Sequence, residues 1–341
     1  MRVMVTGATG NVGSALVRAL VADPGVDEVV GVVRRRPDTT LAPWSQVTWH
    51  TCDLAEPGSR DGLAAAARGC DVAVHLAWKI QPGRDEAGLA RTNLGGLLTV
   101  VQALRTARVP HLVHTSSVGA YSPGPKDRRV DEGWPTGGIA GSVYSRQKAA
   151  AERLLDDVEA ADAGLGVTRV RPALVMQHDA GVEIARYFGG PLLPRWAVGP
   201  LTPPVLPVPP RLRTQVVHAA DLAEAFRLAV HARPGGGLNV AGEPDLGPDE
   251  LARALGARRA VPAPAGALRA LVHASWALRL QPTDPGWFDM GLWTPLMDTT
   301  RVRSELGWRP DRDAVGAFAD LVAGMRGTAG LAGSPPLHRG R

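Results

Sequence analysis

The sequence predicts an α/β protein whose core is a doubly wound parallel sheet, with a smaller, discontinuous C-terminal lobe. Two observations carry this prediction. A short apolar strand at the start of the chain runs into a glycine-rich turn and then into a segment with helical periodicity. Further strand-like runs then alternate with helical segments, at residues 28–33, 47–50, 71–77 and 111–117. Such alternation is typical of parallel sheets covered by helices on both faces.

The glycine turn spans Thr6–Gly13, between the expected strand at residues 2–5 and a helix beginning near Ser14. Its glycines at positions 7, 10 and 13 let the backbone turn sharply, approach a pyrophosphate and pack helix on strand. The N–H groups at the start of the helix can bind phosphates. The spacing is Gly-x-x-Gly-x-x-Gly, not the Gly-x-Gly-x-x-Gly of most dehydrogenases, and an ordinary tight turn is the alternative interpretation.

The second strand ends in Arg34-Arg35-Arg36, where an NAD-binding protein usually carries a carboxylate for the adenosine ribose. Guanidinium groups suit a 2′-phosphate instead, because they can bind its oxygens in a bidentate manner. The sequence therefore predicts NADP as the preferred cofactor, bound by Arg34 and Arg35, with NAD also possible. A solvated basic turn is the alternative.

Tyr144 and Lys148 are separated by one helical turn, so they share a helix face. A tyrosine normally ionises near pH ~10. A positive charge beside it favours the phenolate and lowers this pKa, which makes the pair suitable as an acid and base for alcohol–ketone chemistry. A tyrosine and a lysine also occur at this spacing by chance on exposed helices. The glycine turn upstream is therefore what favours a catalytic role for this pair.

Taken together, these motifs resemble the extended short-chain dehydrogenase/reductase family, the NAD(P)-dependent epimerase/dehydratase group. The resemblance covers nearly the whole chain and implies a Rossmann-type sheet. The matching pieces, in order, are Thr6–Gly13, Asp53-Leu54, His75-Leu76-Ala77, Asn93, Ser116-Ser117, Tyr144 with Lys148, Arg171-Pro172, Val217-His218 with Asp221, Leu238-Asn239-Val240, and Leu306-Gly307-Trp308 with Pro310.

The resemblance implies a catalytic role for Ser117, Tyr144 and Lys148. Ser117 would hydrogen-bond the substrate oxygen, Tyr144 would act as acid and base, and Lys148 would bind the nicotinamide ribose and lower the tyrosine pKa. Asn93 would organise water or only kink its helix. No metal site is expected. The cofactor contacts that the motifs and the resemblance imply are Gly7, Thr9, Gly10, Asn11, Val12, Gly13, Arg34, Arg35, Asp53, Leu54, Leu76, Ala77, Trp78, Asn93, Thr115, Tyr144, Lys148, Pro172, Ala173 and Val175.

Departures from the family pattern narrow the expected reaction. Sugar dehydratases of this group need an added Asp-Glu pair after the catalytic hydroxyl, where this chain has Val118-Gly119. The segment after Arg171 is apolar and lacks the asparagine that usually binds a sugar diphosphate. Arg213 lies one position from the usual arginine, so it either reaches a phosphate or lies in a solvated turn. The sequence thus favours an apolar ketone or alcohol as the small-molecule substrate.

The substrate lobe is expected to be discontinuous, because segments near 216 and 238 match elements of the nucleotide-binding domain. We expect that domain at residues 1–176 and 213–240, the lobe at 177–212 and 241–326, and a disordered tail at 327–341. The proline-rich run at 190–210 is expected to be an apolar loop over the active site or part of a subunit contact. Four aromatic residues in the later lobe segment would line an apolar pocket or form core: Trp276, Trp287, Phe288 and Trp293.

Composition excludes several classes of protein. The formal charge of +5 comes mostly from scattered arginine, without a nucleic-acid-binding motif. No apolar run is long enough to span a bilayer, and no signal-peptide pattern precedes the first strand. Two cysteines, Cys52 and Cys70, fit a reducing cytoplasm. We therefore expect a cytoplasmic enzyme that binds neither nucleic acid nor membrane, with a homodimer common among proteins that it resembles.

Three functions remain open from the sequence. The first is an NADP-dependent oxidoreductase acting on a ketone or secondary alcohol. The second is a sugar epimerase that retains NAD and returns the hydride to the opposite face. The third is a dinucleotide sensor without catalysis, which the presence of Ser117, Tyr144 and Lys148 disfavours.

Overall fold

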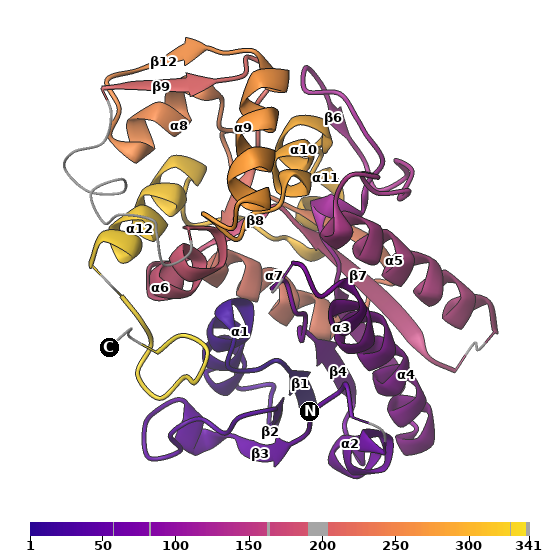
Figure 1. Cartoon of the computed structure of the whole chain (residues 1–341). Coiled ribbons are helices and arrows are strands. Elements are labelled where there is room, and N and C mark those ends of the chain that lie inside the picture. Colours follow the sequence, from indigo (N-terminus) through magenta and orange to yellow (C-terminus); the bar gives the residue numbers. More distant parts are fainter. Residues whose placement is uncertain (57, 82, 162–163, 190–203, 328, 339–341) are drawn as a thin grey trace.

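The computed structural model describes residues 1–56, 58–81, 83–161, 164–189, 204–327 and 329–338 (Figure 1). Its centre is a parallel sheet of seven strands in the order β11-β7-β5-β4-β1-β2-β3. The strands are β1 (Arg2–Thr6), β2 (Glu28–Val33), β3 (Thr48–Thr51), β4 (Val72–His75), β5 (His111–Thr115), β7 (Gly166–Pro172) and β11 (Gly236–Val240). The predicted Rossmann-type, doubly wound sheet is confirmed.

Strand β1 lies at the middle of the sheet, between β2 and β4. Val5 is opposite Gly31 of β2 and Val74 of β4. Val3, Met4 and Val5 are all fully buried, as expected for a parallel strand with helices on both faces. The strand order runs outward from β1 in one direction and from β4 in the other. The topological switch point, where ligands bind in such folds, therefore lies between β1 and β4.

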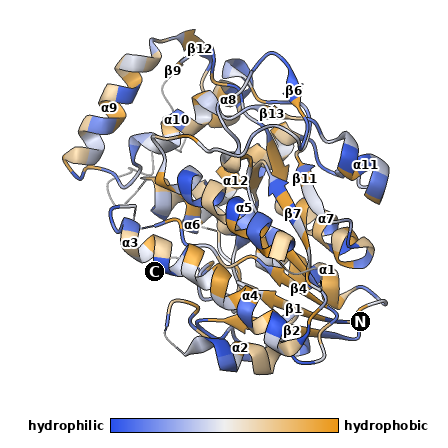
Figure 2. Ribbon diagram, turned by 90° about the vertical axis from the view of Figure 1, so that its right-hand side faces the viewer, coloured by the Kyte–Doolittle hydropathy of each residue, from blue (hydrophilic) through white to orange (hydrophobic). Residues whose placement is uncertain are grey.

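Helices cover both faces of the sheet and enclose a separate apolar core on each side. In Figure 2 strands β1, β2 and β4 are predominantly orange, whereas α2 carries blue, hydrophilic residues. One face bears α1 (Asn11–Val21), α7 (Ala219–Ala232) and α11 (Thr300–Leu306). The other bears α2 (Ser59–Ala67), α4 (Gly96–Ala107) and α5 (Val143–Ala161). Helix α3 (Glu86–Ala90) continues into α4 through a π-helical turn, Arg91–Gly95.

The lobe forms the upper part of Figure 1 and is built from short strand pairs and helices. The pairs are β8 (Leu174–Met176) with β10 (Val216–His218), β9 (Val205–Val208) with β12 (Arg259–Pro262), and β6 (Arg129–Val130) with β13 (Leu296–Met297). The helices are α6 (Gly181–Ile184), α8 (Pro248–Leu255), α9 (Ala265–Ala277), α10 (Pro285–Trp293) and α12 (Ala314–Gly327). Short 3-10 turns occur at Trp44–Gln46, Val118–Ala120 and His178–Ala180, and a π turn at Ala185–Gly189.

The chain crosses between the sheet and the lobe more often than the sequence indicates. Helix α7 and strand β11 lie on the sheet, as expected for residues 213–240. Helix α11, within the expected lobe segment, also returns to the sheet, where Val302 and Trp308 are fully buried in the same core as α7. Trp308 is fixed there because its indole N–H donates to Asp221 O at 2.8 Å.

The expected proline-rich loop is only partly visible. Residues 190–203 lie outside the described part of the chain. The end of the run forms β9, which pairs in parallel with β12. None of the helices among the described residues is long and apolar enough to cross a membrane.

The sequence predicts a disordered tail at 327–341, whereas the structure gives residues 329–338 a defined position. Helix α12 ends at Gly327, and residues 329–338 pack against the nucleotide-binding half. Trp44 Nε1 donates to Ala332 O at 3.1 Å, and Ser334 Oγ donates to Thr9 O at 2.8 Å. Leu337 is 1% exposed. Hydrogen bonds and apolar burial thus order a segment whose Gly- and Pro-rich composition by itself predicts disorder.

Candidate active site

The glycine turn between β1 and α1 is shaped by close backbone approaches. Gly7 has a φ of +69°, and a Cβ there would lie 2.7 Å from Ala77 N. A Cβ at Gly13 would lie 2.2 Å from Gly7 O, so helix and turn could not approach with any larger residue. Gly10 has only Gly7 O near its missing Cβ, at 3.5 Å. The turn is therefore closed by Gly7 and Gly13 and open at Gly10.

The start of α1 offers unpaired polar groups toward this opening. Its N-cap, Gly10, supplies no side-chain cap, and the first N–H groups of any helix lack intrahelical partners. Asn11 donates weakly to Val175 O at 3.4 Å, while its Oδ1 is buried without a hydrogen-bond partner. These groups fit the phosphates and ribose of a dinucleotide.

A pocket of about 240 Å³ lies beside the turn at the switch point. Many predicted cofactor contacts line it: Gly7, Thr9, Gly10, Arg34, Arg35, Asp53, Leu54, Leu76, Ala77 and Trp78. The remaining wall was not expected from the sequence and consists of Val32, Val33, Cys52, Lys79, Thr92, Glu183, Tyr187 and Pro336. Glu183, Tyr187 and Pro336 come from the lobe and the tail, and no local motif marks them.

The basic strand end faces this pocket. Arg34 and Arg35 are exposed and line it, whereas Arg36 reaches back to Trp49 O at 3.5 Å. Within the described chain Arg34 forms no ion pair, so its guanidinium is available to a ligand. Glu183 lies near Arg35 and accepts a hydrogen bond from Tyr187 at 2.9 Å; burial raises the pKa of this carboxyl.

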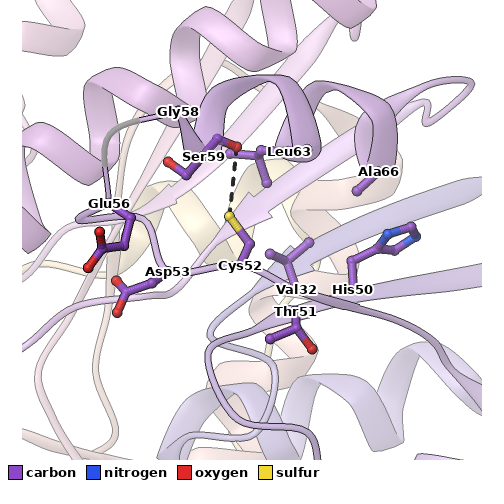
Figure 3. Close-up of a pocket in the computed structure, with 11 residues that line it drawn as sticks. Val32, His50, Thr51, Cys52, Asp53, Glu56, Gly58, Ser59, Leu63 and Ala66 are labelled. Atoms are coloured by element: carbon purple, nitrogen blue, oxygen red, sulfur yellow. Dashed lines mark hydrogen bonds between the residues drawn. The ribbon is translucent and has the colours of Figure 1, made fainter.

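A second hollow of about 400 Å³ lies between β3 and α2 (Figure 3). Cys52 stands in its wall, with Sγ 3.8 Å from Ser59 O. The hollow shares Val32, Cys52 and Asp53 with the first pocket. Neither the glycine turn nor any predicted catalytic residue lines it, so the larger hollow is not the reaction site.

Several expected cofactor contacts lie near the pocket without lining it. Thr115 ends β5 and has a buried Oγ1 without a partner. Ala173 follows β7 and donates from its N–H to Val240 O at 2.9 Å. Val12, Pro172 and Val175 likewise lie beside the turn or the end of β7 outside the pocket wall.

Asn93 lies where the helix is distorted, which agrees with the expectation that it kinks its helix, and its side chain is hydrogen-bonded to protein groups. It lies in the π-helical turn and is 1% exposed. Its Oδ1 accepts from Lys79 N at 2.7 Å, and its Nδ2 donates to Lys79 O at 2.9 Å and to Gln147 Oε1 at 2.7 Å. Asn93 therefore fixes the loop after β4 to α5.

The structure brings Ser117, Tyr144 and Lys148 together, as expected. Ser117 caps the turn after β5, and its Oγ accepts from Gly119 N at 3.0 Å. Tyr144 is in the first turn of α5, and its hydroxyl lies close enough to Ser117 for the two to interact. A Cβ on Gly119 would lie 3.1 Å from Tyr144 Cε1, so glycine here lets the ring approach the serine.

The pKa of Tyr144 differs from the expectation. Burial raises it, and only the hydrogen bond with Ser117 opposes this effect. Lys148 Nζ is 5.9 Å from the Tyr144 ring centroid, donates to Thr115 O at 2.7 Å and lies 3.5 Å from the centroid of the Trp78 ring. Burial holds the lysine pKa well below its usual range. Desolvation therefore outweighs the lowering expected from Lys148, and Tyr144 is a protonated phenol at neutral pH.

Aromatic rings surround the tyrosine. Tyr144 and Trp287 have centroids 4.9 Å apart, and Trp78 meets Tyr144 edge-on at 6.4 Å. Phe188 packs edge-on against Trp287 at 4.9 Å. Of the four lobe aromatic residues singled out in the sequence, Trp287 is the one in ring contact with Tyr144. Phe188 had no sequence signal.

A buried hydrogen-bond network holds Ser116 and so positions its neighbour Ser117. Arg171 binds Glu152 through two hydrogen bonds of 2.8 and 2.9 Å, and Ser116 donates to the same carboxylate at 2.5 Å. Arg171 also donates to the Tyr121 hydroxyl at 3.0 Å, which donates to Asn239 Oδ1 at 2.6 Å. This network ties β5, α5, β7 and β11 together one residue before Ser117.

The fold and its pocket are those of a dinucleotide-binding α/β protein. Residues 3–241 match the NAD dependent epimerase/dehydratase family, and the chain belongs to this family. An uncharacterized protein of Mycobacterium tuberculosis is 28% identical over 338 residues, 97% of this chain but 31% of that protein. The chain thus spans about a third of the length of that relative.

Two further comparisons concern named enzymes. A 4-hydroxy-2-methyl-3-oxo-4-farnesyl-3,4-dihydroquinoline-1-oxide ketoreductase of Stigmatella aurantiaca is 29% identical over 238 residues, 69% of this chain and 66% of that enzyme. The crystal structure of Thermus thermophilus UDP-glucose 4-epimerase with NAD has a TM-score of 0.70 and 24% identity, and covers 96% of this chain and 100% of that one. At this identity the likeness shows the shared fold.

Proposed function

We propose that this protein is an NADP-dependent oxidoreductase that transfers hydride between nicotinamide and an apolar ketone or secondary alcohol. The observation that carries the proposal is the contact of Tyr144 with Ser117, beside Lys148, next to the glycine-turn pocket. Gly10, Arg34, Arg35 and the start of α1 would bind the dinucleotide, which supplies the hydride when bound.

The protein's own residues handle the proton. Because burial raises the pKa of Tyr144, its phenol is protonated at neutral pH and can donate to a developing alkoxide. Ser117 Oγ lies beside this phenol and can hydrogen-bond the same substrate oxygen. The rings of Trp78 and Trp287 pack beside the phenol and would shield part of it from solvent. This arrangement favours the reduction of a ketone.

The preference for NADP rests on Arg34 and Arg35. Both line the pocket at the end of β2, where a 2′-phosphate would lie in this fold. No carboxylate occupies the strand end itself. The buried Glu183, hydrogen-bonded to Tyr187, has a raised pKa and so opposes an anion less than an ordinary carboxylate does.

An apolar substrate suits the ring cluster around Tyr144 better than a sugar diphosphate does. Two described cations that could bind a diphosphate, Arg211 and Arg213, are already engaged. Arg213 Nε donates to Asp245 at 2.9 Å, and Arg211 lies 4.7 Å from the centroid of the Trp293 ring and donates to backbone carbonyls. The Stigmatella relative is, by name, a ketoreductase of a farnesylated ring system.

The test is a screen of cyclic and long-chain ketones, with UDP-glucose as the comparison, in the presence of NADPH or NADH. Oxidation of the reduced cofactor is followed by absorbance. The proposal predicts turnover of an apolar ketone with NADPH, and exchangeable NADP after denaturation of the purified protein. Tightly retained NAD together with conversion of UDP-glucose and no net cofactor oxidation would support a sugar epimerase instead.

We also propose that the protein is a homodimer that associates through α4 and α5. Leu98, on α4, is a large apolar side chain that is 45% exposed. Analytical ultracentrifugation should give twice the mass of the chain, and Leu98→Glu should shift the protein to a monomer. A monomeric wild-type protein at micromolar concentration would refute this assembly.

A further inference from the structure

The segment after α12, residues 329–338, crosses the nucleotide-binding half as a strap. It leaves α12 with Ala329 N donating to Gly324 O at 2.9 Å. It then runs along the loop between β2 and β3, where Gly333 O accepts from Asp38 N at 3.0 Å and Ala332 O accepts from Trp44 Nε1 at 3.1 Å. In Figure 1 this yellow segment lies beside α1 and the loop between β2 and β3.

The strap is attached directly to the glycine turn by one buried side chain. Ser334 is 2% exposed, and its Oγ donates to Thr9 O at 2.8 Å while accepting from Leu337 N at 3.2 Å. Leu331 N donates to Leu337 O at 2.6 Å, so the strap is closed into a small loop. The position of the turn that faces the dinucleotide is therefore coupled to the position of the strap.

The strap also forms part of the pocket wall. Pro336 lines the pocket together with Gly10, Arg34, Arg35 and Tyr187. A dinucleotide bound along the glycine turn would therefore lie against the strap.

The strap is a pocket wall that can move without disturbing the sheet. It is joined to the body by a few hydrogen bonds and by the burial of Ala329 and Leu337, which are 7% and 1% exposed. Segments with so few contacts open locally at a free energy well below that of global unfolding. The turn, β2 and the loop after β4 are all continuous with the buried core.

We propose that residues 329–338 are part of the dinucleotide site, and that the hydrogen bond from Ser334 to Thr9 retains the bound cofactor by keeping the strap closed. This inference rests on the proposed function, because it requires a bound dinucleotide. Ser334 acts as a positioning residue through the turn. Loosening the strap accelerates cofactor release and leaves the chemical step unchanged.

The test compares Ser334→Ala and a chain ending at Gly327 with the wild type. Ser304→Ala is the matched control, because Ser304 Oγ on α11 donates only within its own helix, to Arg301 O at 3.3 Å. NADPH release is measured by stopped-flow fluorescence after mixing the complex with excess NADP⁺. Ser334→Ala removes both hydrogen bonds of the hydroxyl, and the loss of the one to Thr9 by itself predicts release about 2- to 12-fold faster. Release should be faster still for the truncated chain. The control and the thermal midpoint of Ser334→Ala stay at wild-type values.

A second readout uses hydrogen exchange. Amides of residues 329–338 should exchange more slowly when NADPH is added to the wild type, and Ser334→Ala should lose most of this protection. If the wild type binds NADPH but both variants release it at the wild-type rate, the strap inference is overturned and the proposed function stands. If the wild type binds neither NADPH nor NADH, the proposed function and the inference are both overturned.

Discussion

Two arginine–carboxylate pairs show how differently the sheet half and the lobe are built. In the sheet half Arg171 binds Glu152, with side chains 6% and 1% exposed. In the lobe Arg269 binds Asp289 with the same two-bond geometry, but its side chain is 46% exposed. The first pair lies among strands that position Ser117; the second joins α9 to α10. The polar contact next to Ser117 is thus buried on both sides, whereas the lobe contact has a solvent-exposed arginine and an Asp289 side chain that is 11% exposed.

Helix α9 illustrates the same contrast. None of its residues is buried, and Leu271 on it is 65% exposed. Helix α5, which carries the catalytic pair, buries eight of its residues. Under the proposed function, the sheet half would therefore determine the reaction, and the exposed α9 belongs to the lobe that would contact the substrate.

The largest expected effect tests whether the chemistry belongs to the sheet half. Tyr144→Phe keeps the ring contact with Trp287 and removes the proton donor. We expect kcat/KM to fall by about 10²- to 10⁴-fold, with NADPH affinity and thermal midpoint nearly unchanged. Steady-state kinetics on the ketone found in the screen and a fluorescence titration measure the two quantities. Turnover close to that of the wild type would show that the acid lies elsewhere.

The second-largest expected effect is the loss of unfolding free energy when the arginine of each ion pair is replaced by glutamine. Arg171→Gln leaves Glu152 buried without its partner, which costs about 3–5 kcal/mol of unfolding free energy. Arg269→Gln breaks a pair whose arginine is 46% exposed and whose aspartate is 11% exposed, and costs about 1 kcal/mol. Urea unfolding of both variants gives the two values. Equal losses of unfolding free energy in the two variants would contradict the distinction between a buried contact in the sheet half and an exposed one in the lobe.

Cofactor selectivity should depend on the sheet half as well. The double variant Arg34→Ser, Arg35→Ser removes charged hydrogen bonds worth about 1.5–3 kcal/mol, so the KM for NADPH should rise by about one to two orders of magnitude, with little change for NADH. Arg213→Ser, which lies outside the pocket wall and is already paired with Asp245, is the control. If the ratio of kcat/KM with NADPH to that with NADH is unchanged, these arginines lie in a solvated turn and do not bind the cofactor.

The smallest expected effect is the pH dependence of stability. His114 is 1% exposed, neither of its ring nitrogens has a partner, and burial lowers its pKa well below the usual value. The unfolded chain therefore takes up the proton first as pH falls below ~6.5, and stability present above that pH is lost.

His114→Leu should therefore reduce the slope of unfolding free energy against pH, by up to about 1.4 kcal/mol per pH unit between roughly pH 6 and pH 4. Part of the acid sensitivity remains, because burial also lowers the pKa of His75 to about 3 and that of His111 to about 4. The exposed His273 of α9 is the matched position in the lobe, where the same substitution should leave the slope unchanged. Identical slopes in wild type and His114→Leu would contradict the assignment.

Most of the sheet half could be read from the sequence, because its signals are local. Gly7 and Gly13 are required by backbone approaches within one turn. Tyr144 and Lys148 share a face because of helical spacing alone. The bonding of Asn93 to Lys79 and Gln147 was not predictable, since it depends on how a π-helical turn meets a loop.

The remaining walls of the pocket come from distant segments. Pro336 and Tyr187 reach the cofactor pocket through the packing of the tail and α6, and neither carries a motif. The raised pKa of Tyr144 could not be predicted from the sequence for the same reason. The spacing of charges along a helix is visible in a sequence, but burial by Trp287 from the lobe is not.

The most direct test of the central claim follows the transferred hydrogen. The ketone identified in the screen is incubated with NADPH deuterated at both C4 positions, and the alcohol is examined by mass spectrometry and NMR. A phenol that protonates the oxygen while the cofactor reduces the carbon predicts one deuterium on the carbinol carbon and a solvent-derived hydroxyl proton. Product without deuterium, or a sugar nucleotide inverted with the labelled NADPH recovered intact, would contradict it.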